Sequence, residues 1–300
     1  MDNQNENHPP VIDYEGSDYQ TSFWKEGGRE YEDRCEQIAL KRLLPDDGDL
    51  LLEIGAGAGR NTPRYTGFKR IVVLDYSLTQ VQQAQKYLGK GDKYIYVAGD
   101  VYRLPFVDNL FDGATMIRVL HHMQDPQSAL EQIYRIMQHK SPFLLEYANK
   151  QNLKAILRYW LGRQVWNPFS LEAIEFEKLN FDFHPKSIKK WLSEARFRLE
   201  RQLTVSHLRV GFLKKWVPTG ILVALDSVFQ FTGDWWQLSP SVFTRSITEK
   251  NSLAKEGNGF FQCPACMKPL PLADPGVEEL VCTSCSKVYP VVDGIYDFRN

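Results

Sequence analysis

A glycine-rich turn between two apolar runs constrains the fold of this chain more than any other feature. Residues 51–54 are typical of a buried strand, and the turn after it carries three glycines: Gly55, Gly57 and Gly59. Residues 71–75 are typical of a second buried strand, which ends in Asp75. In a doubly wound sheet, the carboxyl ends of such strands face the ligand crevice. Asp75 stands 20 residues after Gly55, where it can accept hydrogen bonds from both ribose hydroxyls, so the pair predicts a nucleoside-type cofactor.

The spacing of the glycines argues against a dinucleotide. A dinucleotide fingerprint is G-x-G-x-x-G or A, whereas this chain has G-x-G-x-G followed by Arg60. Glu53 precedes the first glycine by two residues, and a carboxylate there would repel a pyrophosphate. The same carboxylate would suit the ammonium end of a methionine moiety.

Two further strand ends carry polar residues at the expected spacing. The third predicted strand, residues 94–97, is followed by Gly99, Asp100 and Val101, and an acidic residue there can accept a hydrogen bond from an adenine amino group. The fourth, residues 111–117, leads into Arg118 and then into a pair of histidines, His121 and His122.

These motifs together resemble the class I S-adenosylmethionine-dependent methyltransferases, in particular the small-molecule branch related to quinone-biosynthesis enzymes. The resemblance covers roughly residues 28–150, and the stretch 119–137 fits that branch closely. One departure is the turn at 139–142, His-Lys-Ser-Pro, where the family usually has glycines. The resemblance implies an α/β fold with a doubly wound, seven-stranded, mostly parallel sheet. Its strand order would be 3-2-1-4-5-7-6, with strand seven antiparallel.

The resemblance also implies a cofactor site and two catalytic candidates. S-adenosylmethionine would contact ten residues: Glu53, Gly55, Ala56, Gly57, Gly59, Asp75, Tyr76, Asp100, Val101 and Arg118. The sulfonium already activates the methyl group, so the enzyme must hold the nucleophile in line and, if required, accept a proton. Glu146 at the end of strand five and His121 are the candidates, and His121 is preferred to His122 because related enzymes have a candidate base at the first histidine. The alternative is that both histidines pack against or cap the following helix.

Four of the five cysteines predict a metal site. Cys263, Cys266, Cys282 and Cys285 have the spacing C-x2-C-x15-C-x2-C, which is typical of a zinc ribbon. Four thiolates complete a tetrahedron with no open position, so the zinc would be structural. Two disulfides are the alternative, and a reducing cytosol argues against them. Cys35 is expected to be a buried structural thiol. The end of this segment resembles the small zinc-ribbon subunit that activates tRNA and translation-factor methyltransferases.

The chain divides into four parts. Residues 1–27, with Tyr14, Tyr19, Phe23 and Trp24, are expected to form an arm over the active site. Residues 28–248 form the methyltransferase domain, with substrate-side inserts at about 150–184 and 206–240. Polar residues 249–259 form a linker, and 260–300 form the ribbon. The linker predicts two separate cores.

Charge and composition limit the partners and the cellular location expected for this protein. The net charge of −1 offers no field that would attract DNA. The N-terminal residues lack the features of a signal peptide, and the longest apolar run, 221–225, is too short to span a bilayer, so a soluble, cytoplasmic protein is expected. Most of the large apolar residues in the 206–240 insert are expected to extend the core. Lys214, Lys215 and Trp216 beside an apolar helix would also suit a peripheral membrane contact.

The sequence therefore favours methyl transfer to oxygen or carbon of a small or lipid-like acceptor. The first alternative is an RNA- or protein-directed methyltransferase with its ribbon activator fused in cis. The ribbon favours it, whereas neutral charge and the lack of an Asn/Asp-Pro-Pro-Tyr/Phe segment after strand four argue against it. The second is a non-catalytic cofactor-binding scaffold, and the intact cofactor motifs argue against that.

Overall fold

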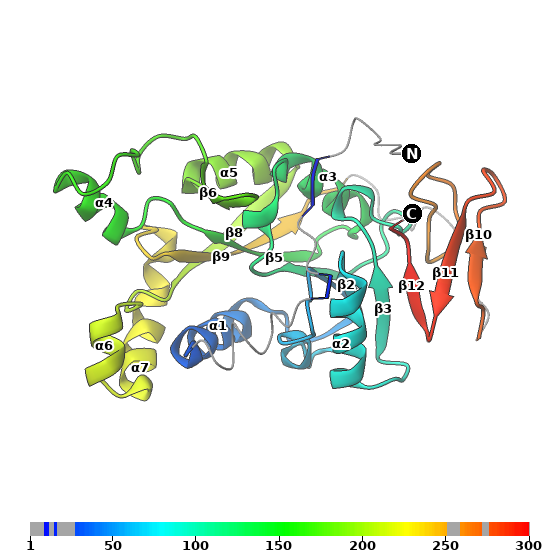
Figure 1. Ribbon diagram of the computed structural model, residues 1–300, viewed down its shortest axis with the longest axis horizontal. Coiled ribbons are helices and arrows are strands. Elements are labelled where there is room, and N and C mark those ends of the chain that lie inside the picture. Colours follow the sequence, from blue (N-terminus) through cyan, green and yellow to red (C-terminus); the bar gives the residue numbers. More distant parts are fainter. Residues whose placement is uncertain (1–8, 12–14, 17–27, 251–258, 272–275, 300) are drawn as a thin grey trace.

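A single ten-stranded sheet runs through the described part of the computed structural model, which comprises residues 9–11, 15–16, 28–250, 259–271 and 276–299 (Figure 1). Most of the predicted arm and linker, including Tyr14, Tyr19, Phe23 and Trp24, lies outside the described residues. The sheet order is β10-β11-β12-β3-β2-β1-β4-β5-β9-β8. The strands are β1 (Gly48–Ile54), β2 (Phe68–Asp75), β3 (Tyr94–Ala98), β4 (Gly113–Met116), β5 (Pro142–Ala148), β8 (Phe197–Val205), β9 (Ser241–Thr248), β10 (Glu279–Val281), β11 (Val288–Val292) and β12 (Ile295–Asp297).

The predicted topology is confirmed for the seven strands of the methyltransferase domain. Strands β3, β2, β1, β4 and β5 pair in parallel, and β9 is antiparallel to both β5 and β8. This is the expected order 3-2-1-4-5-7-6. The carboxyl ends of the five parallel strands therefore meet at one edge of the sheet, where the predicted motifs lie.

Helices cover both faces of the sheet. Helices α1 (Glu30–Leu43), α2 (Leu78–Leu88) and α7 (Thr219–Phe229) contribute to the hydrophobic cluster on one face, and α3 (Pro126–Ile136) and α5 (Pro185–Glu194) to the cluster on the other. Caps set where the helices begin. The Ser77 hydroxyl accepts a hydrogen bond from the Gln80 amide, and Asp125 accepts one from the Ser128 amide, with Pro126 at the first helical position.

The cysteine-rich segment extends the sheet and does not form a separate core. Strand β12 pairs in parallel with β3, and the Phe298 amide donates to the Ala98 carbonyl at 2.8 Å. Phe261 stacks on Phe106 with ring centroids 5.9 Å apart, and the buried residues of both parts form one hydrophobic cluster. The expectation of two cores is therefore wrong, because the edge of β3 offers both unpaired backbone groups and an apolar surface.

The two inserts build the end of the molecule at the left of Figure 1. They contain α4 (Leu153–Trp160), the hairpin β6 (Ile174–Glu177)–β7 (Asn180–Asp182), α6 (Gly211–Trp216), α7 and the 3₁₀ turn η5 (Gln230–Asp234). The expectation that most large apolar residues of the 206–240 insert extend the core is wrong. Leu222 and Val223 are buried in the core, but most of the others are exposed, namely Phe212, Trp216, Ile221, Leu225, Val228, Phe229, Phe231, Trp235 and Trp236. In the described residues, no helix has the length and apolar character needed to cross a membrane.

Candidate active site

A pocket opens at the carboxyl ends of β1, β2 and β4, where the predicted cofactor residues converge. Eight of the ten predicted residues line it: Glu53, Gly55, Ala56, Gly57, Asp75, Tyr76, Val101 and Arg118. Gly59 and Asp100 do not. A Cβ on Gly59 would lie 3.0 Å from the Leu88 side chain, so this glycine serves helix packing. Asp100 accepts a hydrogen bond from the Tyr102 amide at 2.9 Å and begins the 3₁₀ turn η3 (Val101–Arg103).

The glycine turn is shaped by close contact and by a carboxylate. Gly55 has φ +66°, and a Cβ there would lie 2.2 Å from Val119, so no other residue fits without a shift. Asp75 accepts hydrogen bonds from the Gly57 amide at 2.8 Å and the Ser77 amide at 3.0 Å. These bonds fix the Asp75 carboxylate at the pocket wall, beside the glycine backbone.

Glu53 is a buried carboxyl group at the floor of the pocket. It accepts hydrogen bonds from the Thr62 hydroxyl at 2.5 Å and the Tyr65 hydroxyl at 3.2 Å. Burial raises the pKa of Glu53 to about 7, because the charged form loses its hydration. A cationic group bound beside Glu53 would favour its ionised form.

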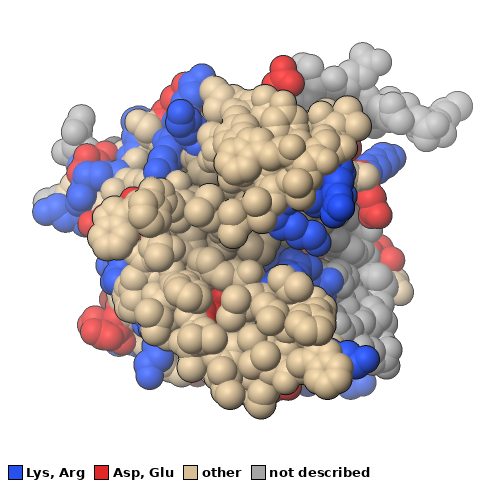
Figure 2. All heavy atoms as spheres, turned by 90° about the vertical axis from the view of Figure 1, so that its left-hand side faces the viewer, with Lys and Arg blue, Asp and Glu red and all other residues tan. Residues whose placement is uncertain are grey.

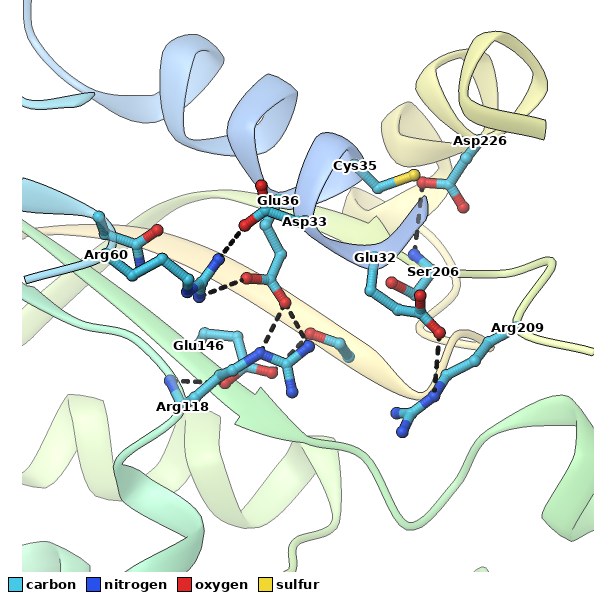
Figure 3. Close-up of polar contacts among 12 residues, drawn as sticks. Glu32, Asp33, Cys35, Glu36, Arg60, Arg118, Glu146, Ser206, Arg209 and Asp226 are labelled. Atoms are coloured by element: carbon cyan, nitrogen blue, oxygen red, sulfur yellow. Dashed lines mark hydrogen bonds and ion pairs between the residues drawn. The ribbon is translucent and has the colours of Figure 1, made fainter. Parts of the chain in front are cut away.

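A chain of ion pairs joins α1 to the loop after β4 (Figure 3). The Arg118 Nε donates to buried Glu36 at 2.6 Å, and Arg60 donates to the other Glu36 oxygen at 2.9 Å. The Arg118 amide donates to Glu146 at 2.9 Å, and the Ser241 hydroxyl donates to Glu146 at 2.5 Å. Arg118 has φ +61°, a backbone conformation that these contacts hold in place. Glu36 was not singled out from sequence, because one acid on an amphipathic helix carries no distinguishing pattern.

The two histidines occupy different environments. His122 lines the pocket, and its Nδ1 lies 3.1 Å from the Leu179 carbonyl oxygen. His121 is not among the pocket residues; its Nδ1 is buried and has no hydrogen-bond partner among the described residues. Burial, with His122 and Arg118 nearby, lowers the pKa of His121 well below its ordinary value. A base role for His121 stays a prediction, and the geometry brings His122 closer to the cofactor pocket.

Asp182 is a candidate that the sequence analysis missed. It lies on β7, which pairs through Phe183 with the chain just after β5. Burial, together with the charge of Glu146, raises the pKa of Asp182 to about 6. No sequence signal marked this residue, because only the folded hairpin brings it near Glu146.

The four predicted cysteines could hold one metal ion. Their sulfur atoms all lie within 4.8 Å of one another, with Cys263 and Cys285 sulfurs 3.7 Å apart and Cys266 and Cys282 sulfurs 3.5 Å apart. Four thiolates at the usual zinc–sulfur length in a tetrahedron would be about 3.8 Å apart. All four cysteines are free of disulfides.

Comparison with known proteins agrees with this arrangement. Residues 52–145 match the model of a methyltransferase domain, and residues 260–294 match that of a Trm112p-like protein. The chain thus carries an S-adenosylmethionine-dependent methyltransferase domain and, C-terminal to it, a Trm112p-like domain that contains the cysteine cluster.

Relatives of known sequence share mainly the first of these domains. An O-methyltransferase cnsE from Penicillium expansum is 33% identical over 35% of this chain and 40% of its own length. The ubiquinone/menaquinone biosynthesis C-methyltransferase UbiE from Roseobacter denitrificans is 26% identical over 54% of this chain and 68% of its own length. A sterol 24-C-methyltransferase from Eremothecium gossypii is matched over only 29% of its length. The first and third relatives are therefore matched over less than half of their length.

Solved structures of similar fold extend the comparison. One is a complex between the Haloferax volcanii Trm112 methyltransferase activator and a putative methyltransferase; it is 16% identical, covers 77% of this chain and 96% of that chain, and has a TM-score of 0.55. A putative S-adenosylmethionine-dependent methyltransferase from Listeria monocytogenes is 13% identical, covers 73% of this chain and 99% of that chain, and has a TM-score of 0.54. At these identities the likeness concerns the fold.

Proposed function

We propose that this protein transfers a methyl group from S-adenosylmethionine to oxygen or carbon of a small or lipid-like acceptor. The observation that carries the acceptor class is the gathering of exposed apolar side chains on the inserts. Of the 24 large hydrophobic residues exposed in the described part of the chain, 19 lie in residues 153–176 and 210–238. The first insert directly follows β5, and the Leu179 carbonyl of its hairpin contacts His122, which lines the cofactor pocket.

The pocket residues suit the charged and polar parts of the cofactor, which supplies the activated methyl group. Asp75 would accept hydrogen bonds from the ribose, and Glu53 would face the ammonium group. The glycine turn lets the backbone approach the ligand closely. Glu36 and Glu146 would act as positioning residues, because they hold the side chain and the amide of Arg118 at the pocket wall.

Two groups are candidates to accept a proton from the acceptor: one lines the cofactor pocket, and the other lies on the β6–β7 hairpin, outside the residues that line that pocket. Asp182 has a pKa of about 6, so it is mostly ionised at neutral pH and still basic enough to take up a proton. His122 lines the pocket and is neutral at that pH because burial lowers its pKa. His121 remains the residue that the family resemblance favours.

For the cysteine cluster we propose one structural zinc ion. The donor set of four thiolates suits zinc, and it leaves no position for a substrate. A ribbon held together in this way would keep β12 on the edge of β3 and would stabilise the strands whose carboxyl ends form the cofactor pocket.

The second candidate function is methylation of RNA or a protein, with the ribbon acting as an activator in cis. The observation in its favour is the match of residues 260–294 to Trm112p-like proteins, together with pairing of that segment with β3. The Haloferax volcanii relative of similar fold is described as a methyltransferase activator bound to a putative methyltransferase.

Transfer of labelled methyl from S-adenosylmethionine into a fractionated lysate separates these candidates. We expect label in the organic phase, and at limiting S-adenosylmethionine the cofactor-site variant Asp75→Ala should incorporate less of it. Label mainly in RNA or protein would replace the small-acceptor proposal with the second candidate. Cofactor binding without any transfer, across all three phases, would favour a non-catalytic scaffold.

A further inference from the structure

The inserts present an apolar face, which we define as the exposed large hydrophobic residues of segments 153–176 and 210–238. Figure 2 looks directly at this end of the molecule: the surface is almost entirely uncharged over a broad hollowed area, and Lys and Arg side chains lie along its margin with some Asp and Glu side chains among them. Monomeric proteins rarely expose apolar patches of this extent without a binding role.

The tryptophans of this face are unusually exposed. Trp160 on the first segment is 70% exposed. On the second segment, Trp216 is 69% exposed, Trp235 75% and Trp236 66%. They come from three separate places in the chain: α4, α6 and the two residues directly after η5. Tryptophan is favoured at the interface between water and lipid, because its ring is apolar and its N–H can still reach polar partners.

The inner sides of α6 and α7 are held against α1 by polar contacts, and the apolar sides of these helices face solvent. The Tyr31 hydroxyl donates to buried Asp226 on α7 at 2.8 Å, and Lys214 on α6 pairs with Glu32 on α1 at 3.0 Å. Figure 3 shows Glu32 and Asp226 on this side of α1 and α7. The exposed residues therefore do not arise from poorly seated helices.

The charges within the apolar face favour an anionic partner. Its two segments contain four exposed basic residues, Lys154, Arg158, Arg163 and Lys215, and three exposed acidic ones, Glu172, Glu175 and Asp234; Lys214 is paired with Glu32 and is not counted. Residues 153–169 contain three of the basic residues and no acidic one. Long basic side chains can lie along an apolar surface while their charged ends reach lipid phosphates.

We propose that the apolar face docks the protein on the surface of an anionic lipid bilayer, without crossing it. Aromatic and aliphatic side chains of α4, α6, α7 and η5 would enter the interface, and the basic residues at its margin would contact lipid headgroups. The inference rests on exposure and charge and does not depend on the proposed reaction. When the protein is docked in this way, the inserts would lie at the bilayer surface, where a molecule dissolved in the lipid could reach them.

Vesicle flotation of the full chain tests this directly. Vesicles of phosphatidylcholine alone are compared with vesicles of phosphatidylcholine mixed equally with phosphatidylglycerol, with no cofactor or acceptor present. We expect binding to the mixed vesicles, accompanied by a blue shift of tryptophan fluorescence, and weaker binding at high salt. Trp216→Ser/Trp235→Ser/Trp236→Ser should lower the partition coefficient at least tenfold, on the order expected for lost interfacial aromatics.

Matched variants keep the result interpretable. Tyr87→Ser/Val281→Ser/Val292→Ser removes three exposed apolar side chains elsewhere and should bind vesicles like the parent. If the tryptophan variant fails to bind S-adenosylhomocysteine and so has not folded, Lys154→Gln/Arg158→Gln replaces it and should weaken binding to the mixed vesicles. No vesicle binding, or equal binding by parent and tryptophan variant, overturns the proposal. A third outcome also overturns it: light scattering shows a dimer that is lost in the tryptophan variant, and the parent does not bind vesicles. In that case a second copy of the chain covers the apolar face.

Discussion

Two regions of this molecule differ in how their side chains are held. The cofactor half comprises the strands β1–β4 and the pocket at their carboxyl ends, and the acceptor half comprises the inserts at about 150–184 and 206–240, where we propose that the acceptor binds. In the cofactor half, the polar residues at the strand ends are fixed: Asp75 by two amides and Glu53 by two hydroxyls. In the acceptor half, large side chains such as Trp160 and Trp235 are mostly exposed. The difference indicates that the first half is preorganised for one ligand, whereas the second is built as a surface.

The ribbon shares its hydrophobic cluster and its sheet with the methyltransferase domain, so loss of the proposed metal should have the largest effect. Cys282→Ser is expected to abolish zinc binding and to lower the melting temperature of the whole chain, since a structural zinc contributes on the order of 10 kcal/mol or more to such folds. Loss of β12 would also expose the edge of β3 and the ring of Phe106. Metal analysis and thermal unfolding measure both effects.

Ser284→Ala, in the exposed knuckle beside Cys282, is the matched control and should keep both metal and melting temperature. If Cys282→Ser released the metal while cofactor binding and the main unfolding transition stayed unchanged, the ribbon would be an independent unit, and the comparison would have to be drawn between three regions.

The acceptor half should supply the proton acceptor. Asp182→Asn is expected to lower kcat about 10²-fold, a typical contribution of a general base, with little change in affinity for S-adenosylhomocysteine. Because the pKa of Asp182 is about 6, parent activity should rise with pH through about 6, and the variant should lose that rise. Glu177→Gln, an exposed acid on the same hairpin, is the control. A full loss in His121→Ala or His122→Ala, with Asp182→Asn unaffected, would place the base on the cofactor side.

Glu53 should make the cofactor half pH-dependent. The pKa of Glu53 is about 7 in the folded protein and near 4.5 in an unfolded chain, so the folded state binds more protons between these values. Stability should therefore fall as pH rises from about 4.5 to 7, by up to about 3 kcal/mol, and Glu53→Gln should remove that slope. Thermal unfolding across this pH range measures it. Affinity for S-adenosylhomocysteine should rise over the same range, because its ammonium group favours ionised Glu53; an equally steep rise in the variant would contradict this.

Asp75 should give the smallest effect of the four. Asp75→Ala is expected to weaken S-adenosylhomocysteine binding by about 1–3 kcal/mol, measured by isothermal titration, because charge-assisted hydrogen bonds to the ribose are lost. Asp75→Asn keeps a carbonyl oxygen for the Gly57 amide and should fall between the parent and Asp75→Ala. Tight NADH binding with no affinity for S-adenosylhomocysteine would overturn the cofactor assignment.

The sequence by itself determined the cofactor half. Parallel strands, glycine turns and helix caps such as Ser77 and Asp125 depend on residues close together in the chain, so their patterns could be recognised before folding. The order of the seven strands of the methyltransferase domain and the cysteine cluster were predicted for the same reason: each rests on local spacing or on a family pattern.

Only the tertiary structure decided how the distant parts meet. The pairing of β12 with β3, the Glu36–Arg118–Glu146 chain and the approach of Asp182 to the sheet join segments far apart in sequence. The exposure of the 206–240 insert was predicted wrongly, because apolar composition alone does not reveal whether a helix has a second element to cover it. Buried polar contacts from α1 fix the inner side of α7, while Trp235 and Trp236 stay 75% and 66% exposed among the described residues, which is why these apolar residues form a surface.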